Sequence, residues 1–338
     1  MSVRILIGDA RERLRELPAA SVHCCVTSPP YFGLRDYGVE GQMGLEATPD
    51  EFVEGMVGLF REVRRVLRDD GTLWLNLGDS YAGGGNGGGG NYAADRANWR
   101  EVPTRSGQRA AVQGLKAKDP IGIPWRVAFA LQADGWWLRQ DIIWSKPNPM
   151  PESVRDRCTK AHEYLFLLSK GPKYHYDVDA IREPLAETSV ARLSQDVAAQ
   201  RGSERVPGKT NGPMKAVAKR GMRSSELETF GLTRGTSNPS CVNAAGANKR
   251  SVWEVATQPF SGAHFATFPP ALIEPCILAG CPKGGTVLDP FGGAGTTGLV
   301  ADRLGRDAIL IELNPEYAAL AQNRISGDAG MFAEVQAA

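Results

Sequence analysis

The chain has 338 residues, with 39 lysines and arginines against 38 aspartates and glutamates, and a net charge of +1 at pH 7. Its 42% hydrophobic and 23% charged residues are typical of a soluble globular protein and exclude a fibrous or intrinsically disordered chain. A near-neutral chain has no global attraction to nucleic acid, so any such attraction must be local. No apolar run is long enough to span a membrane, no signal-peptide pattern is present, and the six cysteines lack paired spacing. We therefore expect a cytoplasmic protein with reduced thiols, no membrane association and no bound metal.

The first eighty residues alternate between apolar runs and amphipathic segments. The expected elements are strand 3–7, helix 10–17, strand 22–26, helix 49–68 and strand 72–77. Thr48 is the expected N-cap of the second helix, and Pro49 lies in its first turn. Asp69-Asp70-Gly71 is expected to turn the chain into the third strand. This β-α-β-α-β order predicts a parallel sheet.

A rigid polar corner, Thr27-Ser28-Pro29-Pro30-Tyr31, follows the second expected strand. Each proline holds φ at about −65° and lacks an N–H donor, so the strand must end here. Open α/β sheets bind ligands at the carboxyl ends of their strands. The Ser28 hydroxyl and the Pro29 carbonyl can accept hydrogen bonds from an exocyclic NH2 group, and Tyr31 can stack on a flat ring. At this point a turn that merely ends the strand remains the alternative.

Two segments in the middle of the chain break the alternating pattern. Residues 82–118 contain the glycine-rich run 83–90, and we expect a mobile loop there, either an insertion or a lid. Residues 182–250 carry twelve basic and six acidic side chains with little hydrophobic periodicity, which suits either phosphate contact or a solvated disordered loop. Between these two segments we expect a helix at 124–133 and strands at 138–144 and 164–168.

A second loop whose residues can bind a ligand follows the expected strand 286–289. Gly293-x-Gly295-x-x-Gly298 matches a dinucleotide-binding fingerprint, an expected helix 299–304 and strand 308–311 follow, and Glu312 ends that strand. Glycines let the backbone approach a ligand closely, and the acid can accept hydrogen bonds from ribose hydroxyls, so we expect an adenosine-containing cofactor. Asp289, just before the glycines, would repel a pyrophosphate and suits the ammonium group of S-adenosylmethionine.

Together, the Ser28–Tyr31 corner and the Asp289–Thr297 loop resemble the amino-methylating DNA methyltransferases of the β order, in which the catalytic motif precedes the cofactor motif. The resemblance covers nearly the whole chain. It implies an α/β, doubly wound, Rossmann-like S-adenosylmethionine-dependent methyltransferase fold with permuted motif order and an inserted target-recognition region. Residues 1–181 would form the catalytic half of that domain, 182–250 the basic recognition insertion, and 251–338 the cofactor-binding half.

The resemblance also implies which residues form the site. Ser28, Pro29, Pro30 and Tyr31 would be catalytic. Asp9 would contact the adenine of the cofactor, Thr267 lies in the stretch 264–269 that would hold the methionine carboxylate, and Glu312 would bind the ribose. The full set of implied cofactor-binding residues is Asp9, Thr267, Asp289, Phe291, Gly293, Gly295, Thr296 and Glu312. Segments 73–79, 141–150 and 163–165 would be later sheet motifs of the family.

The implied reaction moves a methyl group from S-adenosylmethionine to the exocyclic amine of a base flipped out of double-stranded DNA. Family members with serine at position 28 mostly modify cytosine N4, whereas aspartate goes with adenine N6. We therefore favour cytosine N4 and keep adenine N6 as the alternative. A cognate restriction endonuclease is the further partner that the family implies; the recognition sequence and the oligomeric state are not predicted.

Other reactions are less favoured. Carbon-5 cytosine methylation needs a cysteine nucleophile, and Cys276, in the expected helix 270–279, is expected to pack in the core. A nicotinamide oxidoreductase is disfavoured by Asp289 and by the late position of the glycine loop. A protein-glutamine methyltransferase normally has asparagine before the two prolines and the cofactor loop first. A DNA-binding protein without activity is the remaining alternative.

Overall fold

The computed structural model describes residues 1–34, 38–83, 114–186, 246–258, 267–329 and 334–337. The chain divides into two compact units, of which one is Val178–Arg250 and the other is Met1–Asp177 with Ser251–Ala338. In the described part of the smaller unit, Asp179–Ile181 form a short 3-10 helix and Glu183 forms an antiparallel bridge with Ala247. Most of the predicted glycine-rich loop and of the predicted recognition insertion lies outside the described residues.

The larger unit is built on a mixed sheet with the strand order β6-β4-β5-β3-β2-β7-β8-β1-β9 among the described residues. Only β5 runs antiparallel to its two neighbours, and every other described pair is parallel. The strands are β1 (Ser2–Ile7), β2 (Val22–Thr27), β3 (Leu67–Leu77), β4 (Trp137–Ser145), β5 (His162–Ser169), β6 (Val252–Glu254), β7 (Thr286–Asp289), β8 (Asp307–Glu312) and β9 (Glu334–Ala337).

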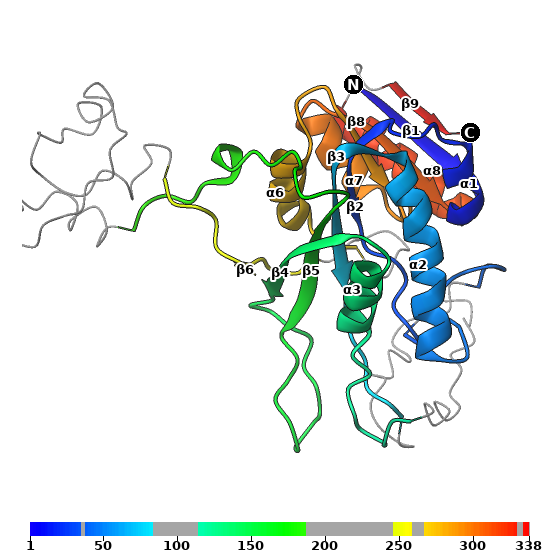
Figure 1. The fold of residues 1–338 in the computed structure, drawn as a ribbon, viewed down its shortest axis with the longest axis vertical. Coiled ribbons are helices and arrows are strands. Elements are labelled where there is room, and N and C mark those ends of the chain that lie inside the picture. Colours follow the sequence, from blue (N-terminus) through cyan, green and yellow to red (C-terminus); the bar gives the residue numbers. More distant parts are fainter. Residues whose placement is uncertain (35–37, 84–113, 187–245, 259–266, 330–333, 338) are drawn as a thin grey trace, which may run out of the picture. The chain divides into compact units, whose positions relative to one another are not determined.

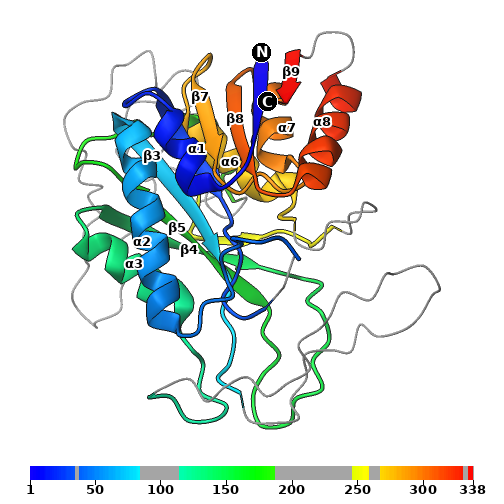
Figure 2. The same ribbon diagram turned by 90° about the vertical axis from the view of Figure 1, so that its right-hand side faces the viewer.

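Helices cover both faces of this sheet. They are α1 (Ala10–Glu16), α2 (Pro49–Val66), α3 (Ile123–Ala133), α6 (Pro270–Gly280), α7 (Thr296–Arg303) and α8 (Pro315–Ala329). Figures 1 and 2 show α1, α2 and α3 on one face and α6, α7 and α8 on the other. Two helical layers around a mostly parallel sheet make a doubly wound α/β fold, as the sequence predicts.

The chain changes direction at the middle of the sheet. From β7 it continues through α7 to β8 on one side, whereas from β2 it continues through α2 to β3 on the other side. β2 and β7 are themselves hydrogen-bonded neighbours, so the topological switch point of the sheet lies at their carboxyl ends. Ligands of open α/β sheets bind at such a topological switch point.

Local sequence signals explain helix α2. The Thr48 side chain accepts a hydrogen bond from the Glu51 amide at 3.2 Å, and Pro49 occupies the first turn, so the predicted N-cap is confirmed. Its buried residues recur every three or four positions and face the core: Phe52, Met56, Leu59, Phe60, Val63 and Val66.

Two predicted boundaries are wrong, and the direction of one strand was not predicted. β3 begins at Leu67, so the predicted turn at 69–71 lies within the strand, where the register against β2 shifts between Val22 and Cys24. α7 begins at Thr296 and not at 299, because Gly295 starts the helix in the left-handed region at φ +76°. Strand 164–168 runs antiparallel, so the sheet is mixed. The sequence prediction also missed α8, β6 and β9.

A buried carboxylate joins the two halves of the sheet at the switch point. Asp289 is 1% exposed, and its Oδ1 accepts hydrogen bonds from Thr27 Oγ1 at 2.6 Å and from the Phe291 amide at 3.0 Å. Its Oδ2 accepts from Thr297 Oγ1 at 2.6 Å. Burial raises the pKa of Asp289, and the hydrogen bonds from Thr27 and Thr297 oppose that rise. One side chain therefore holds the end of β2, the end of β7 and the start of α7 together.

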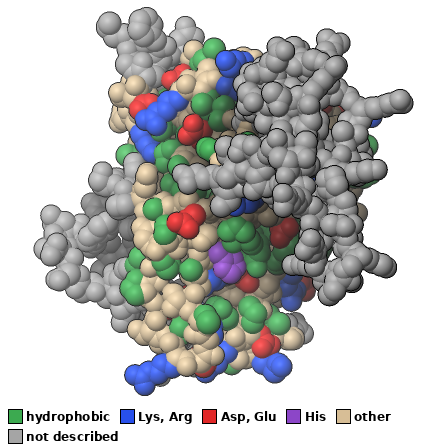
Figure 3. Space-filling view, turned by 90° about the vertical axis from the view of Figure 1, so that its left-hand side faces the viewer, with side chains coloured by type: hydrophobic (Ala, Val, Ile, Leu, Met, Phe, Trp, Pro, Cys, Tyr) green, Lys and Arg blue, Asp and Glu red, His purple; other side chains and the backbone are tan. Residues whose placement is uncertain are grey.

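None of the helices in the described part of the chain is long and apolar enough to cross a membrane. On the face seen in Figure 3, basic and acidic side chains of the described residues are interspersed. This mixture agrees with the near-neutral composition and means that a strong attraction to DNA would have to be local.

Replacing Thr297 by valine removes one donor to the buried Asp289 carboxylate while keeping the shape of the side chain. We expect a loss of about 1–3 kcal/mol in the free energy of unfolding, because hydrogen bonds to charged groups contribute on this scale. The lost donor also raises the folded-state pKa of Asp289 further. An acid with a raised folded-state pKa loses stability as the pH rises through that value, so the deficit should be larger at about pH 7 than at about pH 4.

Urea unfolding of Thr297→Val at both pH values measures this effect, with Thr297→Ser, which keeps the hydroxyl, as the matched control. A Thr297→Val deficit that is equal at the two pH values would show that the hydroxyl does not stabilise an ionised Asp289.

Candidate active site

The predicted site residues lie along one edge of the sheet. β3, β2, β7, β8 and β1 are consecutive parallel neighbours, so their carboxyl ends point to the same side. The residues at or just after those five ends are Gly78, Ser28, Asp289, Glu312 and Asp9. The structure therefore brings both predicted motifs to the same edge although they are far apart in the sequence.

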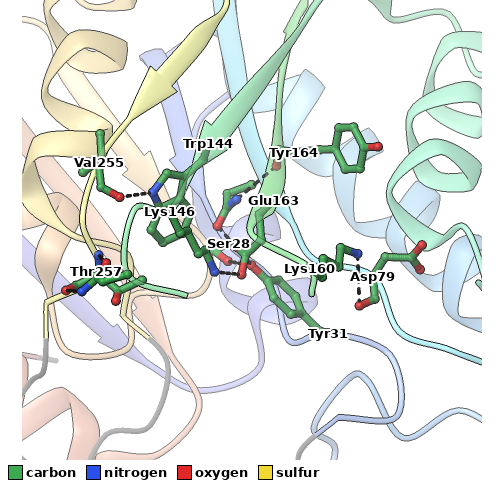
Figure 4. Close-up of polar contacts among 12 residues, drawn as sticks. Ser28, Tyr31, Asp79, Trp144, Lys146, Lys160, Glu163, Tyr164, Val255 and Thr257 are labelled. Carbon is green, nitrogen blue, oxygen red and sulfur yellow. Dashed lines mark hydrogen bonds and ion pairs between the residues drawn. The ribbon is translucent and has the colours of Figure 1, made fainter. Parts of the chain in front are cut away.

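The Ser28–Tyr31 corner forms a hydrogen-bond chain that leads into β3 and β5 (Figure 4). Ser28 Oγ donates to Tyr31 Oη over 3.4 Å, and Tyr31 Oη donates to Glu163 Oε2 over 2.7 Å. Asn76 Oδ1 is a second acceptor for the Tyr31 hydroxyl at 3.1 Å. The Asn76 side chain is held in turn, because its Nδ2 donates to the Tyr164 carbonyl at 3.1 Å.

Glu163 is the charged end of this chain. Its Oε1 forms an ion pair with Lys146 Nζ, and the two side chains are only 16% and 17% exposed. The Lys146 ammonium lies 4.3 Å from the centre of the Trp144 ring, and the Trp144 indole donates to the Val255 carbonyl. The antiparallel register of β4 and β5, which pairs Trp144 with Glu163, places these groups opposite each other. The carboxylate is thus fixed from two sides.

Further charged groups border the same corner. Burial lowers the pKa of Lys160, whose Nζ donates to the Asp79 carbonyl over 3.4 Å. The Asp79 side chain accepts from the Gly122 and Ile123 amides, so it holds the N-terminus of α3. Burial also lowers the pKa of His162. The edge next to Ser28 is therefore polar and partly closed to solvent.

Backbone conformation and close helix packing explain the glycines of this loop. Gly293 and Gly295 have φ of +50° and +76°, which favours glycine. A Cβ on Gly295 would lie 2.8 Å from the Ala321 Cβ, and one on Gly298 would lie 2.9 Å from Ile325 Cδ1. These glycines let α7 approach α8 closely.

Glu312 stabilises the same loop from the end of β8. Its Oε2 accepts from the Gly293 amide at 2.7 Å, and its Oε1 accepts from the Asn314 amide at 2.9 Å. Burial raises the pKa of this carboxyl. Arg324 on α8 adds a contact that the sequence prediction missed, since it donates to the Ala294 carbonyl and to Thr296 Oγ1.

Asp9 lies at the N-terminus of α1 and accepts from the Arg11 amide at 2.7 Å. Its ion pair with Arg11 lowers the pKa of Asp9. Asp9, Glu312 and Asp289 follow three adjacent strands, which concentrates carboxylates at this part of the edge. These negatively charged acceptors suit the cationic group and the hydroxyl donors of an adenosine cofactor with a sulfonium or ammonium group, and they disfavour a pyrophosphate.

Some predicted residues have other surroundings than expected. Both oxygens of Asp289 already accept hydrogen bonds from protein groups, so its contact with a cofactor ammonium stays a prediction. Phe291 is partly buried and packs against the core. Thr267 is partly buried, and residues 264–266 of the same predicted motif lie outside the described residues.

Cys276 is fully buried, and its Sγ donates to the Leu272 carbonyl one helical turn earlier. This environment agrees with the predicted core-packing role. Within the described ranges, no group of three or more histidine, cysteine, aspartate or glutamate side chains could hold a metal ion.

Comparison with known proteins assigns the chain to a family. A family model for N6/N4 methyltransferases, described as DNA methylase, matches residues 22–323. The Type II methyltransferase M.SmaI of Serratia marcescens is 44% identical over 330 residues, which cover 96% of this chain and 91% of the relative. M.XycI of Xanthomonas campestris pv. cyanopsidis is 46% identical over 332 residues, which cover 98% of this chain and 90% of the relative.

Solved structures share the fold. One is a putative DNA modification methylase from Thermus thermophilus, complexed with S-adenosyl-L-methionine. It has a TM-score of 0.55 at 23% identity, and the alignment covers 98% of this chain and 99% of the methylase chain. The cytosine-N4-specific PvuII DNA methyltransferase has a TM-score of 0.54 at 20% identity, and the alignment covers 95% of this chain and 85% of the PvuII chain. The chain therefore belongs to the N6/N4 DNA methylase family and is an S-adenosylmethionine-dependent DNA methyltransferase.

Proposed function

We propose that this enzyme methylates the exocyclic N4 of a cytosine flipped out of double-stranded DNA, at a specific site. The observation that carries the proposal is a serine hydroxyl, and not a carboxylate, at the start of the Pro-Pro-Tyr corner. Ser28 is partly buried, and its Oγ donates to Tyr31 Oη over 3.4 Å. The PvuII enzyme, which shares the fold, is named as cytosine-N4-specific and supports the same choice.

The corner would act by positioning and by hydrogen bonding. An amine conjugated to the base ring is a poor nucleophile, because its lone pair is delocalised. Ser28 Oγ and the Pro29 carbonyl would accept the two amine hydrogens, which draws the nitrogen towards tetrahedral geometry and frees the lone pair. The nitrogen would then attack the sulfonium methyl of the cofactor, so that the N–C bond forms as the S–C bond breaks, S-adenosylhomocysteine leaves and one amine proton is released. Ser28 is thus a hydrogen-bond acceptor and not a covalent nucleophile.

The cofactor would lie across the carboxyl ends of β7, β8 and β1. Glu312 would bind the ribose hydroxyls, Asp9 the adenine, and Thr267 the methionine carboxylate. The Phe291–Thr296 loop would form the wall against which the cofactor packs, held by Gly293, Gly295 and the Arg324 contact with Thr296. Asp289 would act mainly by holding that loop and the end of β2 in fixed positions through its hydrogen bonds with Thr27 and Thr297.

Duplex DNA is the proposed partner, and the basic segment 182–250 is the proposed recognition insertion, with phosphate contacts from its lysines and arginines. The Type II relatives support a cognate restriction endonuclease as a second functional partner. Adenine N6 is the alternative target, because both amines need the same two acceptors.

Identification of the methylated nucleoside tests the choice of base. Purified protein is incubated with labelled S-adenosylmethionine and unmethylated duplex DNA of varied sequence, and the DNA is then digested for mass spectrometry. We expect N4-methylcytosine. N6-methyladenine as the product would show that Ser28 does not select the base, and a lack of any methylated nucleoside would contradict the proposal as a whole.

Ser28→Ala tests the role of the acceptor. We expect the single-turnover rate of methyl transfer to fall by a factor of about 100 or more, as when one electrostatic contact to a transition state is removed. Binding of S-adenosylmethionine, followed by calorimetry, should stay at the wild-type level because Ser28 is not a cofactor ligand. Ser21→Ala, at the opposite end of β2, is the matched control. Wild-type rates in Ser28→Ala would contradict the assigned role.

A further inference from the structure

A serine hydroxyl is a weaker hydrogen-bond acceptor than a carboxylate, because it carries no charge. The proposed function therefore requires something that strengthens Ser28. We infer that Glu163 is a positioning residue that fixes and polarises Ser28 through the Tyr31 hydroxyl. This inference rests on the proposed function and assigns a task to a side chain on β5 that the predicted site did not include.

The hydrogen-bond directions along the chain follow from counting protons. The Tyr31 hydroxyl has one proton and faces two acceptors, Glu163 Oε2 at 2.7 Å and Asn76 Oδ1 at 3.1 Å. Asn76 presents its oxygen because its Nδ2 donates to the Tyr164 carbonyl. With its only proton committed to either acceptor, Tyr31 can only accept from Ser28.

Because Ser28 donates to Tyr31, the Ser28 oxygen can act as the acceptor that the proposed function requires. Its proton points to Tyr31 Oη, so its oxygen lone pairs remain for the hydrogens of the target amine. A reversed chain would aim the Ser28 proton at an amine that is itself a donor, which would repel the substrate. Glu163 and Asn76 thus decide whether position 28 acts as an acceptor or as a donor.

The negative charge of Glu163 also polarises the Tyr31 and Ser28 hydroxyls. Hydrogen bonds in a chain strengthen one another in a medium of low dielectric constant, and the Glu163 side chain is 16% exposed. A carboxylate that accepts from Tyr31 makes the phenol oxygen a better acceptor for Ser28, which in turn makes the Ser28 oxygen more negative. Lys146 holds the other carboxylate oxygen and keeps Glu163 aimed at Tyr31.

The Tyr31 ring has little freedom to leave this arrangement. A Cβ on Gly78 would lie 2.5 Å from Tyr31 Cε2, so only glycine leaves room for the ring beside the end of β3. A Cβ on Gly44, which has φ +98°, would lie 3.1 Å from the Tyr31 carbonyl oxygen. Asn76 and Glu163 lie on β3 and β5, whose antiparallel ladder sets their separation. The link between Glu163 and Ser28 is therefore built into the sheet.

Glu163→Gln keeps the size of the side chain and removes its charge. We expect the single-turnover rate of methyl transfer to fall by about tenfold, which corresponds to about 1.4 kcal/mol, the order by which a hydrogen bond to a charged group exceeds a neutral one in energy. The Kd values for duplex DNA and for S-adenosylmethionine should stay within about twofold of wild type, because Glu163 acts on the rate and not on binding. Glu62→Gln, which breaks a half-buried ion pair with Arg65 on α2, is the matched control.

A double-mutant cycle with Tyr31→Phe separates this role from a merely structural one. Tyr31→Phe removes the hydroxyl through which Glu163 acts, so Glu163→Gln should cause no further loss of rate in that background. If the double variant loses the product of the two single losses, or if Glu163→Gln transfers methyl groups at the wild-type rate, the inference is wrong.

Glu163→Gln leaves Lys146 without its carboxylate partner and can impair folding. In that case Lys146→Met with Glu163→Gln removes the ion pair as a unit and carries the same rate measurement and the same cycle. Wild-type protein is assayed in parallel on the same DNA. Absence of N4 methylation by wild type contradicts the proposed function, whereas wild-type N4 methylation with unchanged Glu163 variants contradicts only the role of Glu163.

Discussion

The hydrogen bonds of the Asp289 carboxylate are the constraint on which the rest of the site depends. Thr27 and Thr297, both fully buried, donate to its two oxygens, and the Phe291 amide donates as well. Burying a carboxylate is costly unless donors surround it, so the three donors must stay where they are. Because they come from the end of β2, the start of α7 and the turn after β7, these three segments are held in fixed positions relative to one another.

This arrangement also explains how two motifs far apart in the sequence come together at one edge of the sheet. Thr27 and Asp289 are 262 positions apart in sequence, and they meet because β2 and β7 are neighbours in the sheet. On one side of this pair β7, β8 and β1 carry the carboxylates suited to a cationic cofactor. On the other side β2, β3 and β5 carry the groups suited to an amine. Because β2 and β7 are neighbours, both sets of groups lie along the same edge of the sheet.

Much of this could be predicted from sequence because the signals are local. Thr48 and Pro49 mark a helix start, and the two prolines after Ser28 end a strand. The strand–glycine–helix–strand order around Gly293 indicates the cofactor loop. Asn314, whose side chain accepts from the Glu316 amide, and Pro315 carry the same kind of signal for α8, which could have been predicted but was not.

The parts that could not be predicted depend on pairing between distant segments. Glu163 reaches Tyr31 only because β5 lies between β3 and β4, and no spacing in the sequence reveals that order. Arg324 reaches Thr296 only because α8 packs on α7. The early start of β3 at Leu67 depends on its register against β2. Each of these three features depends on tertiary contacts, which local sequence propensity does not reveal.

The reversed direction of β5 has a mechanical consequence. β4 ends and β5 begins at the same edge of the sheet as the Ser28–Tyr31 corner, so the loop between them is anchored there at both ends. Lys146 stands just after one anchor and Glu163 just after the other, and their side chains form the ion pair. The ion pair therefore ties the two ends of this loop to each other directly beside Tyr31.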